Sequence, residues 1–240
     1  GPDGRFAFAG IKYGRQTLRV FPAQHLEPEP IVFTLDPDRR LQNLDVKVSA
    51  GRSVPVIVID QNDDPVAKAV VLAVTEAEVR ARTATDEDGR ASIAVPPGQP
   101  ATLFVIPEEG LFAIHRLPAK EEPGRLKIYL PRASSSLLIR ATTLAGDAMP
   151  RFSLLMRYNG ELVPMEVAEA LTVVQGLQLQ TGPGSEAHLR NIPSGSYEFW
   201  PYRTEAEAES IITAASAMLA PIQVDVRTGQ NKIAVKFAAR

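Results

Sequence analysis

Apolar and polar residues alternate with a period of two in many short stretches of this chain. In residues 90–95, apolar Ala91, Ile93 and Val95 are separated by residues that suit the opposite face of a strand. Such alternation places one face of a β-strand on a core and the other towards solvent. The 20 prolines and 16 glycines interrupt these stretches, so the pattern predicts short strands joined by turns rather than long helices.

A glycine-containing phrase occurs three times along the chain. It begins at residues 3–5 (DGR), at 88–90 (DGR) and, in a degenerate form, at 184–186 (GSE). The copies are roughly 90 residues apart, about the size of one small β-domain. Each repeat also ends in an alternating stretch, at residues 44–48, 126–130 and 233–237. These two signals predict an array of related modules.

The pattern predicts an all-β protein of tandem antiparallel β-sandwiches. Residues 51–132 form the second and most complete repeat, with about seven strands. Residues 133–240 form a third, divergent repeat. Residues 1–50 hold only the C-terminal half of a first sandwich, so its missing strands either lie upstream in a longer parent chain or are replaced by packing on the neighbouring repeat. Half a sandwich leaves open strand edges. We favour the first alternative, and expect the strands of this half to pack on the second repeat or on another copy of the chain.

The third repeat carries an insertion near residues 204–219. Thr204 is a suitable N-cap, and glutamates follow it where a helix N-terminus favours acidic residues. Apolar residues then recur at roughly helical spacing until Pro221. This segment is predicted to form a short helix or an irregular loop, followed by a strand over residues 222–226.

Composition narrows the function by exclusion. The 26 basic and 28 acidic residues leave a formal net charge of -2, so there is no basic footprint for nucleic acid. The chain has no cysteine, which excludes disulfides and thiolate metal sites. No apolar run approaches the ~20 residues that cross a bilayer, and no signal peptide is present, so this segment is not expected to insert into a membrane.

Residues 85–91 (TDEDGRA), followed by PPG at 96–98, resemble the carboxypeptidase regulatory-like family. Residues 60–70 and 192–199 carry further parts of the same pattern. The resemblance implies a transthyretin-like (prealbumin-like) β-sandwich within a long exported bacterial protein, at the cell surface, outside the cell or in the periplasm. It brings no catalytic residues with it, because turns and strand positions carry the match.

Catalytic motifs are not found in the sequence. None of His25, His115 and His188 is followed three positions later by glutamate, as the zinc site of a metallocarboxypeptidase requires. A Gly-x-Ser-x-Gly nucleophile elbow is also missing. The chain is therefore predicted not to be an enzyme.

Two acidic turns in the second repeat form a candidate cation site. Asp60, Asp63 and Asp64 occupy the first turn, and Asp86 and Asp88 the second. If successive strands run up and down, both turns meet at one end of the sandwich and offer the hard oxygens that calcium prefers. The alternative is that aspartate is simply a favoured turn residue. Calcium is the one candidate ion, and no cofactor is required.

An aromatic cluster near residue 200 is the second candidate site. On a strand, Tyr197 and Phe199 share one face and Trp200 and Tyr202 share the other. Trp200 and Tyr202 either form an exposed platform for a sugar ring or a partner protein, or lie beneath the insertion. We favour the second alternative, because an inserted helix needs an apolar surface to bury against.

Together these features predict a non-enzymatic structural, spacer or interaction module of a larger exported bacterial multidomain protein. The alternative is a carbohydrate- or peptide-binding accessory module that uses Trp200 and Tyr202. In either case the expected partner is a protein or a glycan, together with the rest of a longer parent chain upstream.

Overall fold

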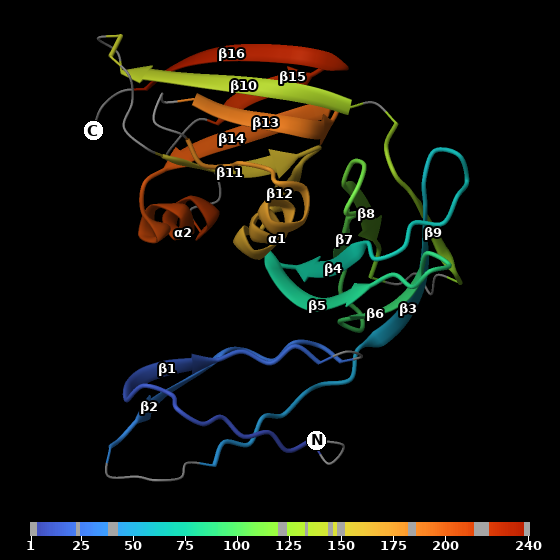
Figure 1. Cartoon of the computed structure of the whole chain (residues 1–240), viewed down its shortest axis with the longest axis vertical. Coiled ribbons are helices and arrows are strands. Elements are labelled where there is room, and N and C mark those ends of the chain that lie inside the picture. The colour runs from blue at the N-terminus through green and yellow to red at the C-terminus, as the bar shows by residue number, and fades with distance from the viewer. Residues whose placement is uncertain are drawn as a thin grey trace.

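The computed structural model describes residues 4–22, 25–37, 43–119, 124–132, 134–143, 146–147, 152–181, 186–213 and 221–237. Within these residues the chain is mostly β-structure, with two short helices, which confirms the predicted all-β class. Figure 1 shows two sandwiches packed on each other and an elongated arm, made by the first fifty residues, below them.

The middle sandwich contains seven strands in the described part of the chain. One sheet has the order β6-β3-β9 and the other β5-β4-β7-β8. The strands are β3 (Arg52–Ile59), β4 (Val70–Thr75), β5 (Glu78–Ala84), β6 (Arg90–Val95), β7 (Ala101–Ile106), β8 (Ala113–Leu117) and β9 (Leu126–Tyr129).

The C-terminal sandwich also shows seven strands among its described residues, together with both helices. Its sheets have the orders β13-β10-β16 and β12-β11-β14-β15. The elements are β10 (Ser134–Thr143), β11 (Ser153–Tyr158), β12 (Glu161–Val163), α1 (Met165–Gln175), β13 (Glu186–Pro193), β14 (Gly195–Tyr202), α2 (Glu205–Thr213), β15 (Ile222–Val226) and β16 (Gly229–Phe237).

The two sandwiches share one topology. When strands are counted from one to seven within each sandwich, both have one sheet of order 4-1-7 and one of order 3-2-5-6 over the described residues. In both, the first strand pairs in parallel with the seventh and antiparallel with the fourth. The two units are therefore structural repeats, although their sequences have diverged.

The arm contains one antiparallel strand pair, β1 (Gly14–Leu18) and β2 (Ile31–Leu35). By its place after the glycine phrase, this pair corresponds to strands five and six, which pair in the same way in both sandwiches. Residues 5–13 and 43–48 are described and form no strand. The strand predicted at residues 44–48 is therefore wrong for this chain.

One of the two helices was predicted from the sequence and the other was not. Helix α2 falls inside the predicted insertion and is capped by Thr204, whose Oγ1 accepts from Glu207 N–H at 3.2 Å. The Glu207 side chain in turn accepts from Arg203 N–H, one residue before the cap, at 2.7 Å. Helix α1 was not predicted at all. It ends at Gly176, which adopts a left-handed conformation with φ 66°.

The inner strands β4 and β7 of the sheet β5-β4-β7-β8 are buried on both faces. One set of alternating residues packs inside the middle sandwich: Val71, Ala73, Leu103 and Val105. The other set joins the core of the C-terminal sandwich: Leu72, Val74, Phe104 and Ile106. A sheet between two cores explains why β4 and β7 are almost continuously apolar rather than alternating.

Candidate functional site: the interface between the two sandwiches

A single apolar cluster joins the two sandwiches. Helix α1 contributes fully buried Val167 and Leu171, and Val163 at the end of β12 packs in the same cluster. They share it with the outer face of β4 and β7 in the middle sandwich. Burial of apolar side chains favours association by about 25 cal/mol per Å². The two sandwiches are thus held together by core packing rather than by the linker alone.

A row of aromatic rings crosses this interface. Phe112 of the middle sandwich meets Tyr158 of β11 edge-on, with ring centroids 5.4 Å apart. Tyr158 lies 4.8 Å from Tyr197, which stacks on Phe199 at 5.7 Å. Contacts of this geometry stabilise beyond the area they bury. The row links the interface to the interior of the C-terminal sandwich.

Both phenols in this row are hydrogen-bonded to backbone carbonyls. Tyr158 donates to Ser194 O at 3.1 Å, and Tyr197 donates to Pro193 O at 2.7 Å. Burial raises the pKa of Tyr158 above its ordinary value, and a side-chain hydrogen bond with Asn159 partly offsets this. Burial, and secondly the nearby Tyr158, raise the pKa of Tyr197 far above its ordinary value. Both groups therefore act as neutral donors.

Alkaline pH is expected to destabilise the protein through Tyr197. Its pKa is higher in the folded state than in the unfolded chain, where it is about 10, so this contribution is complete below pH ~10 and is lost as the pH rises further. The expected slope is about 1.4 kcal/mol per pH unit for each such phenol. Urea unfolding between pH 8 and 11.5 measures it. Tyr197→Phe should flatten the slope above pH 10, and an unchanged slope would contradict this assignment.

Polar contacts border the apolar interface. Thr102 Oγ1 on β7 donates to Glu161 Oε2 at 3.0 Å, and Arg116 on β8 forms an ion pair with the same glutamate. On α1, Gln175 Nε2 donates to Pro107 O at 3.0 Å. These contacts fix the orientation of the two sandwiches, because hydrogen bonds are directional and core packing is not.

The arm is anchored to the middle sandwich by a charged clasp. Glu27, whose side chain is 10% exposed, accepts two hydrogen bonds from Arg82 on β5, at 2.6 and 3.2 Å. Its N–H donates to Arg80 O at 2.6 Å, and Leu26 is buried in the core of the middle sandwich. The Arg82 guanidinium also lies 4.0 Å from the Phe21 ring centroid. Bidentate pairing and a cation–π contact give this junction a defined geometry.

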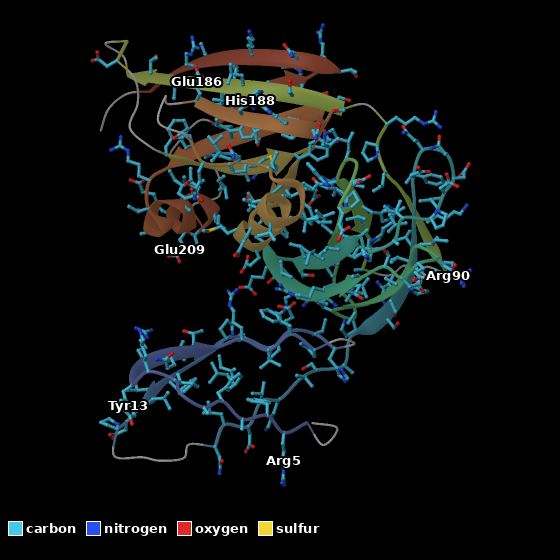
Figure 2. The ribbon with its side chains drawn as sticks, viewed as in Figure 1. Arg5, Tyr13, Arg90, Glu186, His188 and Glu209 are labelled. Carbon is cyan, nitrogen blue, oxygen red and sulfur yellow. The ribbon has the colours of Figure 1, made fainter. Side chains whose placement is uncertain are left out.

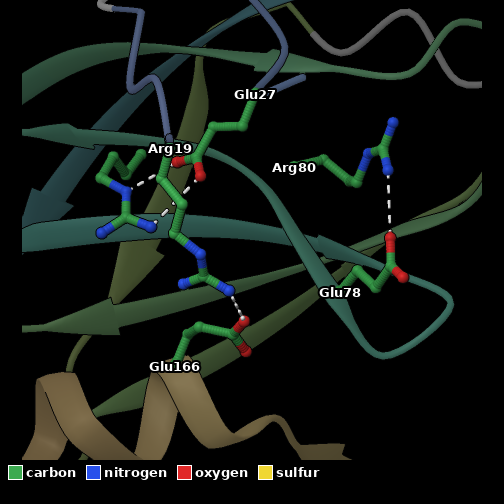
Figure 3. A network of polar contacts seen from close by, with 6 residues as sticks. Arg19, Glu27, Glu78, Arg80 and Glu166 are labelled. Atoms are coloured by element: carbon green, nitrogen blue, oxygen red, sulfur yellow. Dashed lines mark hydrogen bonds and ion pairs between the residues drawn. The ribbon is translucent and has the colours of Figure 1, made fainter. Parts of the chain in front are cut away.

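Figure 3 shows how the arm, the middle sandwich and α1 meet at this junction. Arg19 of the arm contacts Glu166 of α1 at 3.3 Å, and Arg80 contacts Glu78 within β5 at 3.1 Å. A cavity of about 340 Å³ lies between them. The Arg19–Glu166 and Arg82–Glu27 pairs each join the arm to a sandwich, whereas the Arg80–Glu78 pair stays within β5.

The acidic turns predicted as a calcium site lie side by side. Val58 N–H donates to Gly89 O at 2.8 Å, and Val66 N–H donates to Val58 O at 3.0 Å, so β3 joins the two turns. Asp60 Oδ1 accepts from the N–H groups of residues 62 and 64, at 2.7 and 3.0 Å. Asp86 Oδ1 accepts from those of residues 88 and 90, at 3.0 and 2.8 Å.

These bonds are the side-chain-to-backbone contacts typical of Asx turns. Asp63, with φ 65°, and Asp64 complete the first turn, and Asp88 pairs with Arg90 at 2.9 Å. Among the described residues no group of three or more histidines or carboxylates is arranged to hold a metal ion. Calcium binding at this end stays a prediction.

Asp86→Ala is expected to cost about 1 kcal/mol, because two backbone donors lose their acceptor. Asp88→Ala is the matched control and should cost less than about 0.5 kcal/mol, since it removes only an exposed ion pair. Thermal melting measures both variants. If calcium binds here, millimolar Ca²⁺ raises the wild-type Tm but not that of Asp86→Ala. An unshifted wild-type Tm would remove calcium from these turns.

The aromatic pair Trp200 and Tyr202 is not an exposed platform. Trp200 is only 4% exposed, and the Arg157 guanidinium lies 5.1 Å from its ring centroid. Tyr202 is half-buried. Helix α2 packs against β14, the strand that carries both residues. The exposed-platform alternative is therefore wrong for Trp200. Its side chain is buried on the sheet, and the inserted helix α2 packs against the same strand.

A groove of about 780 Å³ runs between α1, β11 and residues 178–181. Tyr202 and Glu209 lie at its edge, and Val173 of α1, which is 78% exposed, lines it. The sequence analysis missed this groove because it missed α1. The helix had a signal: Val167, Leu171 and Val174 follow helical spacing ahead of Gly176.

The three histidines come from different parts of the fold. His25 is exposed on the arm, His115 lies on β8, and His188 is exposed on β13, near Glu186 in Figure 2. Across the described ranges, no helix is both long and apolar enough to cross a membrane.

Comparison with known proteins assigns no family. No family model matches the chain, and no curated protein matches it. The resemblance to the carboxypeptidase regulatory-like family therefore stays a prediction.

Similar solved structures include the Bacillus anthracis TIE protein, with 15% identity over 92% of this chain and a TM-score of 0.31. The Streptococcal ancillary pilin has 11% identity over 96% of this chain and 77% of its own, with a TM-score of 0.32. The minor pilin of Streptococcus agalactiae has 9% identity over 76% of this chain and 94% of its own, with a TM-score of 0.35. The chain spans 41% of the TIE protein. At these scores the likeness assigns no function.

Proposed function

We propose that this chain is a non-enzymatic spacer of a larger exported bacterial protein, in which the two sandwiches act as one rigid unit under tension. The export context is supported by the family resemblance of residues 85–98. The mechanical role is supported by the way the chain enters and leaves each sandwich.

The parallel pairing of the first and last strands carries this proposal. In the C-terminal sandwich, β10 and β16 pair in parallel from Ser135 opposite Gly229 to Thr143 opposite Phe237. In the middle sandwich, β3 and β9 pair in the same way. The chain therefore enters each sandwich at one end and leaves at the other. Tension along the chain shears the terminal pair, so its hydrogen bonds are loaded together rather than one after another.

The shared core supports the same role. The apolar cluster that contains α1 and the outer face of β4 and β7 belongs to both sandwiches. Interfaces between domains of one chain normally allow relative motion unless they are large and hydrophobic. Here core packing and a polar border both resist bending. A spacer needs resistance to bending, because a flexible joint would let the distance and the angle between its two ends vary.

Single-molecule pulling through introduced cysteines tests the proposal, because the chain has none of its own. Ser134→Cys with Ala234→Cys loads β10 and β16 in shear. Ser134→Cys with Gln230→Cys is the matched control, which opens the same strand pair from one end. Ser134, Gln230 and Ala234 are all exposed, so the replacements leave the core intact.

We expect the shear pair to resist a several-fold higher force than the control pair at the same pulling speed, since forced unfolding is governed by the unfolding rate. Equal forces in the two geometries would overturn the proposed role under tension.

A further inference from the structure

The arm exposes most of the large apolar side chains found at the surface of the described chain. Seven large apolar side chains on the arm are between 39% and 68% exposed: Phe6, Phe8, Ile11, Tyr13, Phe21, Val32 and Val48. Outside the arm, the exposed large apolar side chains of the described chain are Tyr129 and Val173. In Figure 2, Tyr13 and Arg5 lie on the arm, away from both sandwiches. A concentration of apolar surface of this kind marks an interaction site.

Strand topology shows what this surface lacks. In the described parts of both sandwiches, strands four and seven lie on either side of strand one and do not pair with each other. On the arm, residues 5–9 and 43–48 occupy positions four and seven, and both are described without strand structure. Strand five pairs with strands two and six in both sandwiches, whereas β1 pairs with β2 alone among described residues. The described arm thus contains the segments that pair with strands one and two in the sandwiches, but it does not contain strands one and two themselves.

The glycines of the repeated phrase provide independent support. Gly89 has φ 69°, and a Cβ added there would lie 2.5 Å from Val58 O of β3, which is strand one. Gly4 has the matching φ of 75°, but an added Cβ would meet nothing within 4 Å. The backbone of the first copy has adopted the conformation of the second without the strand against which that conformation packs.

We propose that the arm accepts three consecutive β-strands from the same polypeptide, supplied on the N-terminal side of Gly4. The first of these strands lies between residues 5–9 and 43–48, and the second pairs with the open edge of β1. The third continues the same sheet beyond the second.

A segment of the same chain fits best because of the connection that the motif makes. In the middle sandwich the DGR phrase follows strand three after a short turn, from Ala84 to Arg90. The same phrase in the first copy places strand three within a few residues of Gly4. A segment tethered so closely has an effective concentration in the millimolar range, which a separate chain does not reach.

Hydrogen exchange measured by mass spectrometry tests the proposal. The 240-residue chain is compared with a longer chain that carries about 45 further upstream residues of its own reading frame, the length of three strands with their turns. We expect backbone amides in residues 5–9 and 43–48 to exchange at least 100-fold more slowly in the longer chain. Unchanged exchange, or a reading frame without this segment, would overturn the proposal. Protection of the 240-residue chain that rises with its concentration would assign the site to a second copy instead.

Two arm variants sharpen this test. Phe8 corresponds to Ile93, which is buried, and Ala7 corresponds to Ser92 on the solvent face of β6. Phe8→Asp should abolish the added protection in the longer chain, whereas Ala7→Asp should keep it. In the 240-residue chain, where Phe8 is 64% exposed, both should leave exchange within about two-fold of wild type. Equal effects of both variants in the longer chain would contradict the assigned register.

Discussion

Phe112→Ala is expected to lower the free energy of unfolding by about 3–5 kcal/mol, and to do so in both sandwiches. Phe112 belongs to the middle sandwich, is fully buried, and packs edge-on against Tyr158 of the C-terminal sandwich. Its removal leaves a cavity within the core that both units share. The cost is therefore not confined to the unit that carries the substitution.

The single tryptophan makes this coupling measurable. Trp200 lies on β14 in the C-terminal sandwich, so its fluorescence reports the unfolding of that unit. In urea, the Trp200 transition of Phe112→Ala should move to lower denaturant concentration. Val173→Ala, at an exposed position on α1, is the control and should stay within about 0.5 kcal/mol of wild type. A Trp200 transition that Phe112→Ala leaves unmoved would show that the sandwiches unfold independently.

Gly89→Ala is expected to cost more than about 3 kcal/mol, whereas Gly98→Ala should cost about 1–2 kcal/mol. Both glycines have left-handed φ angles, 69° and 72°, so both substitutions carry the same backbone strain. A Cβ at Gly98 would meet nothing within 4 Å, but at Gly89 it would lie 2.5 Å from Val58 O. The backbone of β3 must then move and lose its hydrogen bond to Gly89 O.

Urea unfolding of the two glycine variants, with the m-value checked, separates the shared strain from the close contact. The difference between the variants measures the contact alone. Equal losses would mean that Gly89 was selected for its backbone conformation and not for the approach of β3.

Local features of the fold could be predicted from the sequence where neighbouring residues decide them. The Thr204 cap and the glutamates after it predicted where α2 begins, and the strand predicted over residues 222–226 is β15. The rest of the predicted insertion, from residue 214 to 219, lies outside the described residues. The aspartates of residues 60–64 and 86–88 form the turns expected of them. In each case the deciding hydrogen bonds join residues only a few positions apart, so a single stretch of sequence contains both partners.

The candidate site could not be predicted in the same way, because its partners lie far apart in the sequence. The strand pattern placed Trp200 on the face opposite Tyr197 and Phe199, but how deeply it is buried depends on segments elsewhere in the chain. Phe112 and Tyr158 meet only because α1 and β12 pack on the outer face of β4 and β7. The continuous apolar runs of those two strands were a signal of two-sided burial, but they do not say what covers the second face.

Local sequence patterns were enough to predict a repeated all-β chain of short strands with a capped insertion. Period-two alternation and turn chemistry act within a few residues, so they can be read along the chain. The shared core of the two sandwiches and the open arm could be seen only in the folded chain. Those outcomes depend on which surfaces meet in the folded chain. The hydrophobic effect is non-directional, so an apolar stretch of sequence does not say which distant segment will cover it.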